Sequence, residues 1–473
     1  MRLALAIAMI FVSRFAVSAW FDPGRDGDIA WQQWLGLQIL HTGSLPLSLG
    51  PQAFTAAGAP WIPQEWALSL AVALTLGTPL FAALVAATTL AAAAVLLFTA
   101  LASRRLGAST VAIGLAVFCV GFSMLESYGI RAQVFGWALL AAVMYLLRCV
   151  PGRAKWWIVP LVALWANLHA SAMLAPALLA LWAAGTALQE RAWNAKVREY
   201  ALLAIASGGA VFLTPLGYRL PLYALELVHS PIRRAITEWQ PSSLSAVSFT
   251  FGALVLIAGV CILRVERSRR WPELLVIAAV TYMAITAVRN APVCAIVLAP
   301  VVAERLTFKF LPQRVRANAL FTERPVLALL YCGAFTAALL SALLLAASPE
   351  FKRGDLPQAA IARLASLPGT HRLYCEDFAW CSLALSHENL QDFIDGRADP
   401  FPLAVWQDYI TVFHVKGDWR AVLDRRRVNA VLVDKKRELA HALPLWRGWR
   451  LVYAQGDYRL FIRSGAGSQT GKD

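Results

Sequence analysis

The sequence predicts a polytopic α-helical membrane protein that ends in a small α/β domain. Of its 473 residues, 59% are hydrophobic and only 15% are charged, whereas a typical soluble domain has about 25% charged residues. The stretch 67–102 contains no charged residue, and about 20 apolar residues are enough to cross a bilayer. This composition excludes a soluble enzyme, a disordered chain and a disulfide-rich secreted scaffold.

Eleven apolar segments are predicted to cross the membrane. They are residues 3–20, 66–102, 109–127, 131–148, 156–169, 171–188, 198–214, 247–264, 272–288, 291–304 and 325–347. The second segment is too long for one straight crossing and contains Gly77-Thr78-Pro79. It is either one broken or tilted helix, or a half-helix followed by a full one.

The first segment also has features of a signal peptide, because Val17-Ser18-Ala19 resembles a signal-peptidase site. Arg14 interrupts its apolar core, which is unusual for a signal peptide. We therefore expect an uncleaved first span.

The charges in the loops assign the two sides of the membrane. Alternate loops hold 17 basic and six acidic residues, whereas the first loop on the opposite side, residues 21–65, holds four acids and one base. The positive-inside rule then places the N-terminus in the cytoplasm and, after eleven spans, the C-terminus outside. The net charge of +15 therefore reflects cytoplasmic loops that face membrane lipids, and no nucleic-acid partner is expected. The predicted location is the inner membrane of a bacterium.

The chain changes character near residue 350. Helices are predicted at 356–367 after an Asp355 cap, at 404–415 and at 419–427, and strands at 372–374, 429–433, 449–453 and 458–462. The expected division is a membrane-spanning domain over 1–349, a periplasmic α/β domain over 350–463 and a disordered tail over 464–473. Cys375 and Cys381 lie close together in the second part, and they could form a disulfide if that part is outside the cytoplasm.

Unusual polar residues gather at the predicted outer ends of the spans. They are Asp26, Asp28 and Glu65 in the first loop, and Arg131, Gln133, Asn167, His169, Arg219, Glu238, Arg289 and Asn290 in later turns. Several of these turns are very short, so the side chains are expected at the bilayer boundary, where ionisable groups are costly and tend to be functional. Interfacial snorkelling is the alternative explanation.

This mixture of residues suits a substrate that carries phosphate and an acceptor that must lose a proton. Arginine forks bind phosphate oxygens bidentately, and a carboxylate can act as a general base. Asp26 and Asp28 could also hold Mg²⁺ or Mn²⁺ through oxygen. The tryptophans near the outer boundary indicate first an aromatic belt. They are Trp20, Trp31, Trp34, Trp61, Trp66 and Trp239.

The ordered motifs resemble the GT-C superfamily of integral-membrane glycosyltransferases, and more closely a bacterial glycosyltransferase-like branch of it. The matching pieces are Asp28-x-x-Trp31, Gly58-x-Pro60-Trp61, Glu65-Trp66, Arg131-x-Gln133, Trp165-Ala166-Asn167-Leu168-His169, Thr214-Pro215-x-Gly217, Glu238-Trp239, Arg289-Asn290, Ile394-Asp395-Gly396-Arg397 and Gln407-Asp408-Tyr409. The resemblance implies transfer of a sugar from a polyprenyl-phosphate donor to a lipid, glycan or protein acceptor. It implies Asp28 as the catalytic carboxylate, Glu65 as a second acid, and Arg131, His169 and Arg289 as phosphate ligands.

The chain departs from the branch at two places. Gln32 stands where a histidine often follows the first-loop acid, and residues 49–52 lack an acid that is often found there. These departures keep a non-catalytic scaffold for envelope polysaccharide assembly as an alternative function. A lipid or solute transporter is a further alternative, although transporters usually place ionisable groups near the bilayer midplane.

Overall fold

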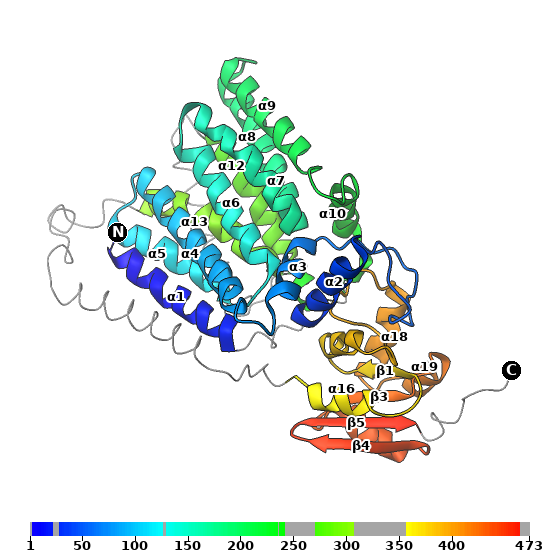
Figure 1. Ribbon diagram of the computed structural model, residues 1–473. Coiled ribbons are helices and arrows are strands. Elements are labelled where there is room, and N and C mark those ends of the chain that lie inside the picture. The colour runs from blue at the N-terminus through cyan, green and yellow to red at the C-terminus, as the bar shows by residue number, and fades with distance from the viewer. Residues whose placement is uncertain are drawn as a thin grey trace. The chain divides into compact units, whose positions relative to one another are not determined.

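The protein divides into two compact units. A computed structural model describes residues 2–21, 28–125, 129–234, 236–241, 270–306 and 356–463. The helical unit consists of Met1–Phe21, Pro79–His229 and Ile236–Phe351, and the sheet unit of Asp22–Thr78, Ser230–Ala235 and Lys352–Asp473. Figure 1 labels the elements of both units.

The helical unit is built from apolar helices that pack along one another. They are α1 (Arg2–Phe21), α4 (Phe81–Arg105), α5 (Thr110–Ser123), α6 (Ala132–Cys149), α7 (Ile158–Leu168), α8 (Leu174–Glu190), α9 (Ala195–Ala210), α10 (Arg219–His229), α12 (Arg270–Thr286) and α13 (Ala291–Leu306). Short 3₁₀ turns connect some of them: η2 (Gly152–Trp157), η3 (Ala170–Met173), η5 (Thr237–Trp239) and η7 (Val288–Asn290). Helix α6 packs against α4 and α7, and α8 packs against α9 and α12 (Figure 1).

Four helices of the described part are long and apolar enough to cross a membrane. They are Arg2–Trp20, Phe81–Arg105, Ala132–Cys149 and Ala170–Glu190. The protein is therefore a multi-pass membrane protein, but the count of eleven spans stays a prediction. The predicted spans at 247–264 and 325–347 lie outside the described residues.

The long predicted span at 66–102 is two helices. Helix α3 (Trp66–Thr75) ends before Gly77, and α4 begins at Phe81. Gly77 has a φ of +82°, which side chains other than glycine rarely adopt. Pro79 then removes a backbone donor at the start of the second helix. The half-helix alternative is therefore the one that the structure adopts.

The sheet unit contains a five-stranded mixed sheet in the order β2-β1-β3-β5-β4. Its strands are β1 (His371–Cys375), β2 (Leu390–Asp392), β3 (Ala430–Asp434), β4 (Trp449–Gln455) and β5 (Tyr458–Arg463). Strand β1 is parallel to both β2 and β3, whereas β5 is antiparallel to β3 and β4. The helices are α16 (Gln358–Ala365), α17 (Phe378–Cys381), α18 (Leu403–Phe413), α19 (Trp419–Arg425) and α20 (Glu438–Ala442). The 3₁₀ turns are η4 (Pro231–Arg234), η8 (Ser382–Ser386) and η9 (Leu443–Leu445).

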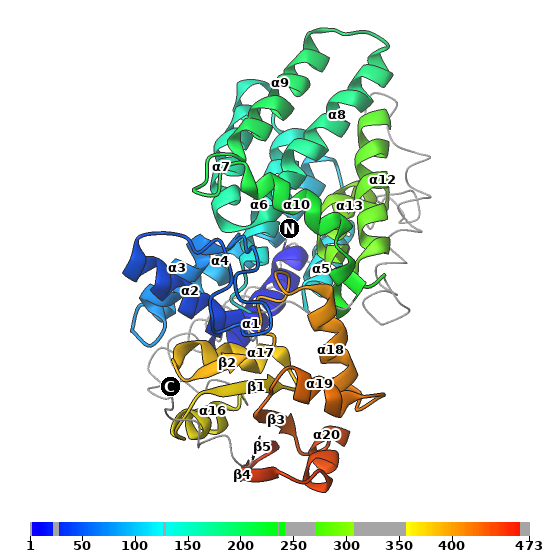
Figure 2. The same cartoon turned by 90° about the vertical axis from the view of Figure 1, so that its right-hand side faces the viewer.

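Alternation along the strands gives the sheet two apolar faces. On one face, side chains such as Leu373 and Leu432 join Ile361 of α16 in a buried core. On the other face, the ring of Tyr374 lies 5.2 Å from that of Tyr409 on α18. Figure 2 shows α18 and α19 beside these strands. Strands β1, β3, β4 and β5 and the longer helices follow the sequence prediction closely, whereas β2 was not predicted. Asp355, the predicted cap, lies outside the described residues.

The first loop is part of the sheet unit. It contains a helix that the sequence did not predict, α2 (Asp28–Thr42), which packs closely on α3. Ala53 forms a parallel bridge with Asp392 at the open edge of β2, and the Asp392 amide donates to the Gln52 carbonyl at 2.8 Å. The loop therefore covers an edge strand that would otherwise present unpaired backbone groups.

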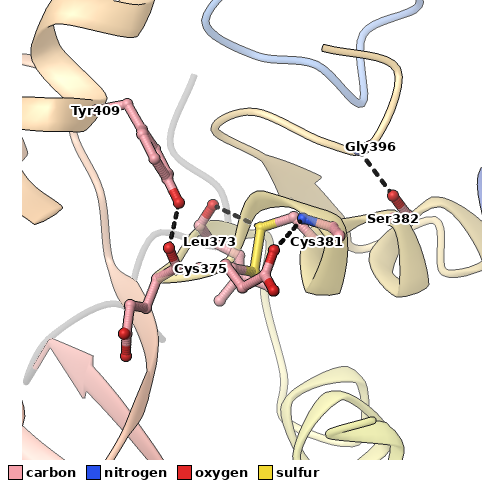
Figure 3. The surroundings of a disulfide bond; sticks show 9 residues. Leu373, Cys375, Cys381, Ser382, Gly396 and Tyr409 are labelled. Carbon is pink, nitrogen blue, oxygen red and sulfur yellow. Dashed lines mark hydrogen bonds between the residues drawn. A yellow bond between two sulfur atoms is a disulfide. The ribbon is translucent and has the colours of Figure 1, made fainter. Parts of the chain in front are cut away.

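A disulfide joins Cys375, at the end of β1, to Cys381 in α17 (Figure 3). Cys375 and Cys381 are the pair that the sequence singled out. The sulfur of Cys381 also lies 3.7 Å from the Leu373 carbonyl. Next to it in the chain, Ser382 accepts a hydrogen bond from the Gly396 amide. The disulfide thus fixes the start of η8 against β1, and the Ser382 hydrogen bond fixes it beside the turn that follows β2.

Candidate functional site

Two arginines of the helical unit converge on one carboxylate. Arg131 is the residue before α6, Arg289 lies in η7 and Glu238 lies in η5. The Glu238 carboxylate is 3.7 Å from Arg131 and 4.0 Å from Arg289, and its side chain is 43% exposed. Both distances exceed those of ordinary hydrogen bonds. The cluster is therefore a loose, partly exposed group in which two guanidinium groups lie beside one carboxylate.

The position of Arg289 depends on its neighbours in η5. Its guanidinium carbon lies 4.2 Å from the centre of the Trp239 ring, within the range of a cation–π contact. The amide of Val288 donates to the Gln240 carbonyl at 3.0 Å. Turns η5 and η7 are thereby joined through both backbone and side chain, although they are about 50 residues apart in the sequence.

His169 follows α7, with an extended backbone. Its Nδ1 accepts the Ser171 amide at 3.0 Å and lies 2.7 Å from the Ser171 hydroxyl. That hydroxyl in turn accepts a hydrogen bond from the Trp165 indole. Because Nδ1 is an acceptor, the neutral imidazole carries its proton on Nε2. A Cβ on Gly136 would lie 3.0 Å from the Ser171 hydroxyl, so this glycine lets α6 approach the histidine turn.

The remaining predicted polar residues of the helical unit have more local contacts. The side-chain amide of Asn167 donates to the carbonyls of Ala163 and Leu213, and that of Asn290 donates to the Met283 carbonyl. These two amides close helix ends and turns. Arg219 is exposed at the start of α10, where its guanidinium stacks on Tyr218. Gln133 is half-buried in the first turn of α6.

The acids of the first loop lie in the sheet unit. Asp28 is the first residue of α2, and the Trp31 indole donates to its carboxylate at 3.0 Å. The helix N-terminus stabilises a negative charge there. Gln32 is completely buried and donates to the Glu65 carboxylate at 2.8 Å. Gln32, which marks a departure from the resembled branch, therefore positions the second acid.

The predicted metal site at Asp26 and Asp28 rests on the oxygen ligands that carboxylates offer. Asp26 lies outside the described residues. Among the residues that the structure describes, no three His, Cys, Asp or Glu side chains are grouped so that they could hold a metal ion. Asp28 has a tryptophan and a helix N-terminus beside it.

The sequence did not identify the partners that hold these residues. Trp31 and Trp61, interpreted as parts of an aromatic belt, are 8% and 3% exposed and pack inside the sheet unit. Their rings lie edge to face, 6.4 Å apart. The spacing Asp28-x-x-Trp31 on a helix was the available signal, because residues three apart share a helix face.

The sequence matches no protein-family model and no curated protein, but the fold matches solved structures. The archaeal oligosaccharyltransferase AglB from Archaeoglobus fulgidus, solved with an inhibitory peptide and a dolichol-phosphate, aligns with a TM-score of 0.59 and 12% identity over 97% of this chain and 74% of its own. ArnT from Cupriavidus metallidurans in the apo state aligns with a TM-score of 0.52 and 14% identity over 99% of this chain and 98% of its own.

A second structure of this ArnT, bound to undecaprenyl phosphate, aligns with a TM-score of 0.51 and 12% identity, over 100% of this chain and 99% of its own. AglB and ArnT are membrane glycosyltransferases of the GT-C superfamily. At identities this low the likeness shows the fold. The chain therefore shares the fold of AglB and ArnT, which is the kind of fold that the resemblance of its motifs implied.

Proposed function

We propose that this protein is a membrane glycosyltransferase that moves a sugar from a polyprenyl-phosphate donor to an envelope acceptor. The observation that supports it best is the fold, which matches ArnT over almost the whole length of both chains, including a structure bound to undecaprenyl phosphate. The acids of the first loop and the basic cluster of the helical unit supply the chemistry that such a transfer needs.

The proposed roles follow from the chemistry of each group. The Asp28 carboxylate accepts a proton from the acceptor hydroxyl as the hydroxyl oxygen attacks the anomeric carbon of the sugar. The bond from that carbon to the phosphate oxygen breaks, and polyprenyl phosphate leaves. Glu65 is the second acid, which assists or replaces Asp28.

The leaving phosphate gains negative charge, which cations must balance. Arg131 and Arg289 are the proposed ligands, because a phosphate can take the place of the loosely held Glu238 carboxylate between them. His169 adds a neutral donor through Nε2, and Arg219 adds a further exposed cation.

The proposal places the reaction on the periplasmic face of a bacterial inner membrane, with the N-terminus in the cytoplasm. The bias of basic residues supports this orientation. The Cys375–Cys381 disulfide also supports it, because disulfides persist in oxidising compartments. A reporter fused after residue 400 that is active only in the cytoplasm would contradict it.

The first test is Asp28→Asn in the full-length protein, assayed in membranes by incorporation of labelled sugar from polyprenyl-phosphate donors. We expect a loss of about 10²–10⁴-fold, the usual cost of removing a general base. If Asp28 only stabilised the start of α2, the change would cost about 1 kcal/mol or less in stability and leave transfer nearly intact. Wild-type-like transfer by this variant would move the role to Asp26 or Glu65.

The same assay tests the phosphate ligands and the alternatives. Arg131→Lys and Arg289→Lys should raise the KM for the donor more than they lower kcat, because lysine keeps the charge but loses the bidentate fork. Addition and chelation of Mg²⁺ or Mn²⁺ test whether Asp26 and Asp28 hold a cation. If the wild type transfers no sugar from any donor, the scaffold alternative is favoured, and vesicle flux assays then test the transporter.

A further inference from the structure

The turn after β2 is the point where the first loop packs on the C-terminal domain. Its residues Phe393, Ile394 and Asp395 are at most 1% exposed. The Thr55 hydroxyl donates to the Phe393 carbonyl at 2.5 Å, and the rings of Phe54 and Phe393 meet edge to face at 5.9 Å. Two segments that are about 340 residues apart in the sequence thus form one packed body.

Gly396, in the same turn, lies directly against the indole that holds Asp28. A Cβ at this position would be 2.8 Å from Trp31 Cδ1, 3.3 Å from Trp31 Nε1 and 2.8 Å from Ser382 Oγ, closer than a Cβ normally approaches such atoms. The Gly396 amide is fixed by the Ser382 hydroxyl at 2.9 Å (Figure 3). The glycine therefore sets how near the turn comes to Trp31, whose Nε1 donates to Asp28.

Arg397 contacts the other side of the first loop. Its guanidinium forms a buried ion pair with Asp395, with Nε 2.9 Å from one carboxylate oxygen and 3.0 Å from the other. Its Cζ lies 5.0 Å from the centre of the Trp34 ring and 4.9 Å from that of Trp61. Trp34 is on α2, and Trp61 lies four residues before Glu65.

Two series of contacts lead from the turn after β2 to the carboxylates of the first loop. One goes from Gly396 through Trp31 to Asp28, and the other from Arg397 through Trp61 to the segment that carries Glu65. We propose that Asp395-Gly396-Arg397 is a positioning element that holds the two acids of the first loop in their working geometry. This inference rests on the proposed function, and it assigns to the C-terminal domain a role in catalysis without contact to the substrate.

The test uses the full-length protein in membranes and compares Gly396→Ala with Gly209→Ala. Gly209 is the matched control, because a Cβ there would meet nothing within 4 Å. Gly396→Ala should lower kcat about 10–100-fold, the loss that a misplacement of about 1 Å produces, while the KM for the donor changes less than about threefold. The control should behave as the wild type.

A double-mutant cycle separates positioning from general damage. Trp31→Phe removes the indole N–H that donates to the Asp28 carboxylate, so it should itself lower kcat about 10-fold. In the Trp31→Phe background, Gly396→Ala should cause little further loss, because both changes act through the same contact. If the kcat of the double variant fell by the product of the two single losses, the proposal would be overturned.

The arginine has its own control. Arg397→Lys should lower kcat about 10-fold, because an ammonium loses the planar fork that pairs with Asp395 and stacks on both indoles. Arg420 also lies over two indoles, 5.3 and 5.8 Å from the ring centres of Trp419 and Trp446, so Arg420→Lys controls for the loss of stacking and should leave kcat unchanged. Suppose that the wild type transfers sugar and Asp28→Asn does not. Full activity of Gly396→Ala and Arg397→Lys would then refute this inference and leave the proposed function standing. A wild type with no transfer would refute the proposed function instead.

Discussion

Helix α6 has an arginine at each end, and the two are held in opposite ways. At its C-terminal end, Arg148 binds the Glu273 carboxylate at 2.6 Å, and both side chains are 1% exposed. At its N-terminal end, Arg131 lies 3.7 Å from Glu238, and the two side chains are 22% and 43% exposed. The Arg148–Glu273 pair is closed to solvent, whereas the Arg131–Glu238 pair is loose and partly exposed to solvent.

The closed pair ties several helices together. Arg148 also donates to the Val297 carbonyl at 2.8 Å, and its guanidinium lies 6.0 Å from the Trp182 ring. It therefore contacts α12, α13 and α8 from α6. Charge at this end, which the sequence predicts to be cytoplasmic, serves packing. Charge at the other end remains accessible to a ligand, which is the arrangement that a phosphate site requires.

The largest expected effect comes from breaking the closed pair. Glu273→Gln leaves Arg148 buried without a counter-charge, which should lower stability by about 3–5 kcal/mol. Thermal melting in detergent and the amount of protein in membranes measure this. Glu190→Gln is the control, because the Lys196–Glu190 pair is exposed and should contribute about 1 kcal/mol or less.

The closed pair can also be removed as a unit. Arg148→Met combined with Glu273→Leu leaves no buried charge, so much of the loss should be recovered. Equal melting temperatures for Glu273→Gln and Glu190→Gln would show that the burial of the pair has no structural consequence. The comparison between the two ends of α6 would then fail.

A third ionic group, in the sheet unit, extends the comparison to solution pH. Asp392 is 1% exposed, and burial, with the adjacent Asp395 carboxylate, raises its pKa well above the ordinary value; Arg397 opposes this in part. The folded state therefore keeps a proton on Asp392 that the unfolded state releases above about pH 4. Stability should fall as the pH rises above that value, by up to about 1.4 kcal/mol per pH unit.

The substitution that tests this is Asp392→Asn, which cannot ionise and keeps a donor for Asp395. The variant should gain stability over the wild type between pH 5 and pH 8, with the difference growing as the pH rises. Melting temperatures of both proteins across this range measure it. Parallel curves would mean that Asp392 is already ionised in the folded protein.

The sequence predicted those parts of the molecule that depend on local composition. Uniform apolar stretches predicted the membrane helices, and short strand-like runs predicted strands such as β3 and β5. The three residues of β2 are too few for a pattern. Helix α2 was missed because its apolar residues are too few to cross a membrane, so they were assigned to the loop between two spans. Its contacts with η8 bind that loop to the C-terminal domain.

Pairing between distant residues was also beyond prediction. Arg148 and Glu273 were counted as loop charges, and nothing in the sequence indicates that they meet in the interior. The ion pair of Asp395 with Arg397 joins residues that are only two apart in the sequence. Its burial beneath Trp34 and Trp61 depends on the fold of segments over 300 residues away.

The smallest expected effect concerns the open pair at Arg131. In the proposed mechanism, Glu238 balances part of the positive charge of Arg131 and Arg289 until a donor phosphate replaces it. Glu238→Gln removes the competing carboxylate, so the KM for the donor should fall about two- to fivefold, the range that a partly exposed pair of up to about 1 kcal/mol allows. The turnover rate should not change. Initial rates over a series of donor concentrations at low salt, where such charges are least screened, measure both constants.

The control for that test is Glu226→Gln, an exposed acid on α10 whose removal changes the net charge equally. If attraction of the donor by net charge alone mattered, both variants would lower the KM. A fall in the KM with Glu238→Gln alone would identify Glu238 as the group that the phosphate displaces. A rise in the KM would instead show that Glu238 orients the two arginines, and a turnover rate lowered by about 100-fold or more would make it the proton acceptor. Either result would contradict the view that a donor phosphate displaces Glu238 from Arg131 at the N-terminal end of α6.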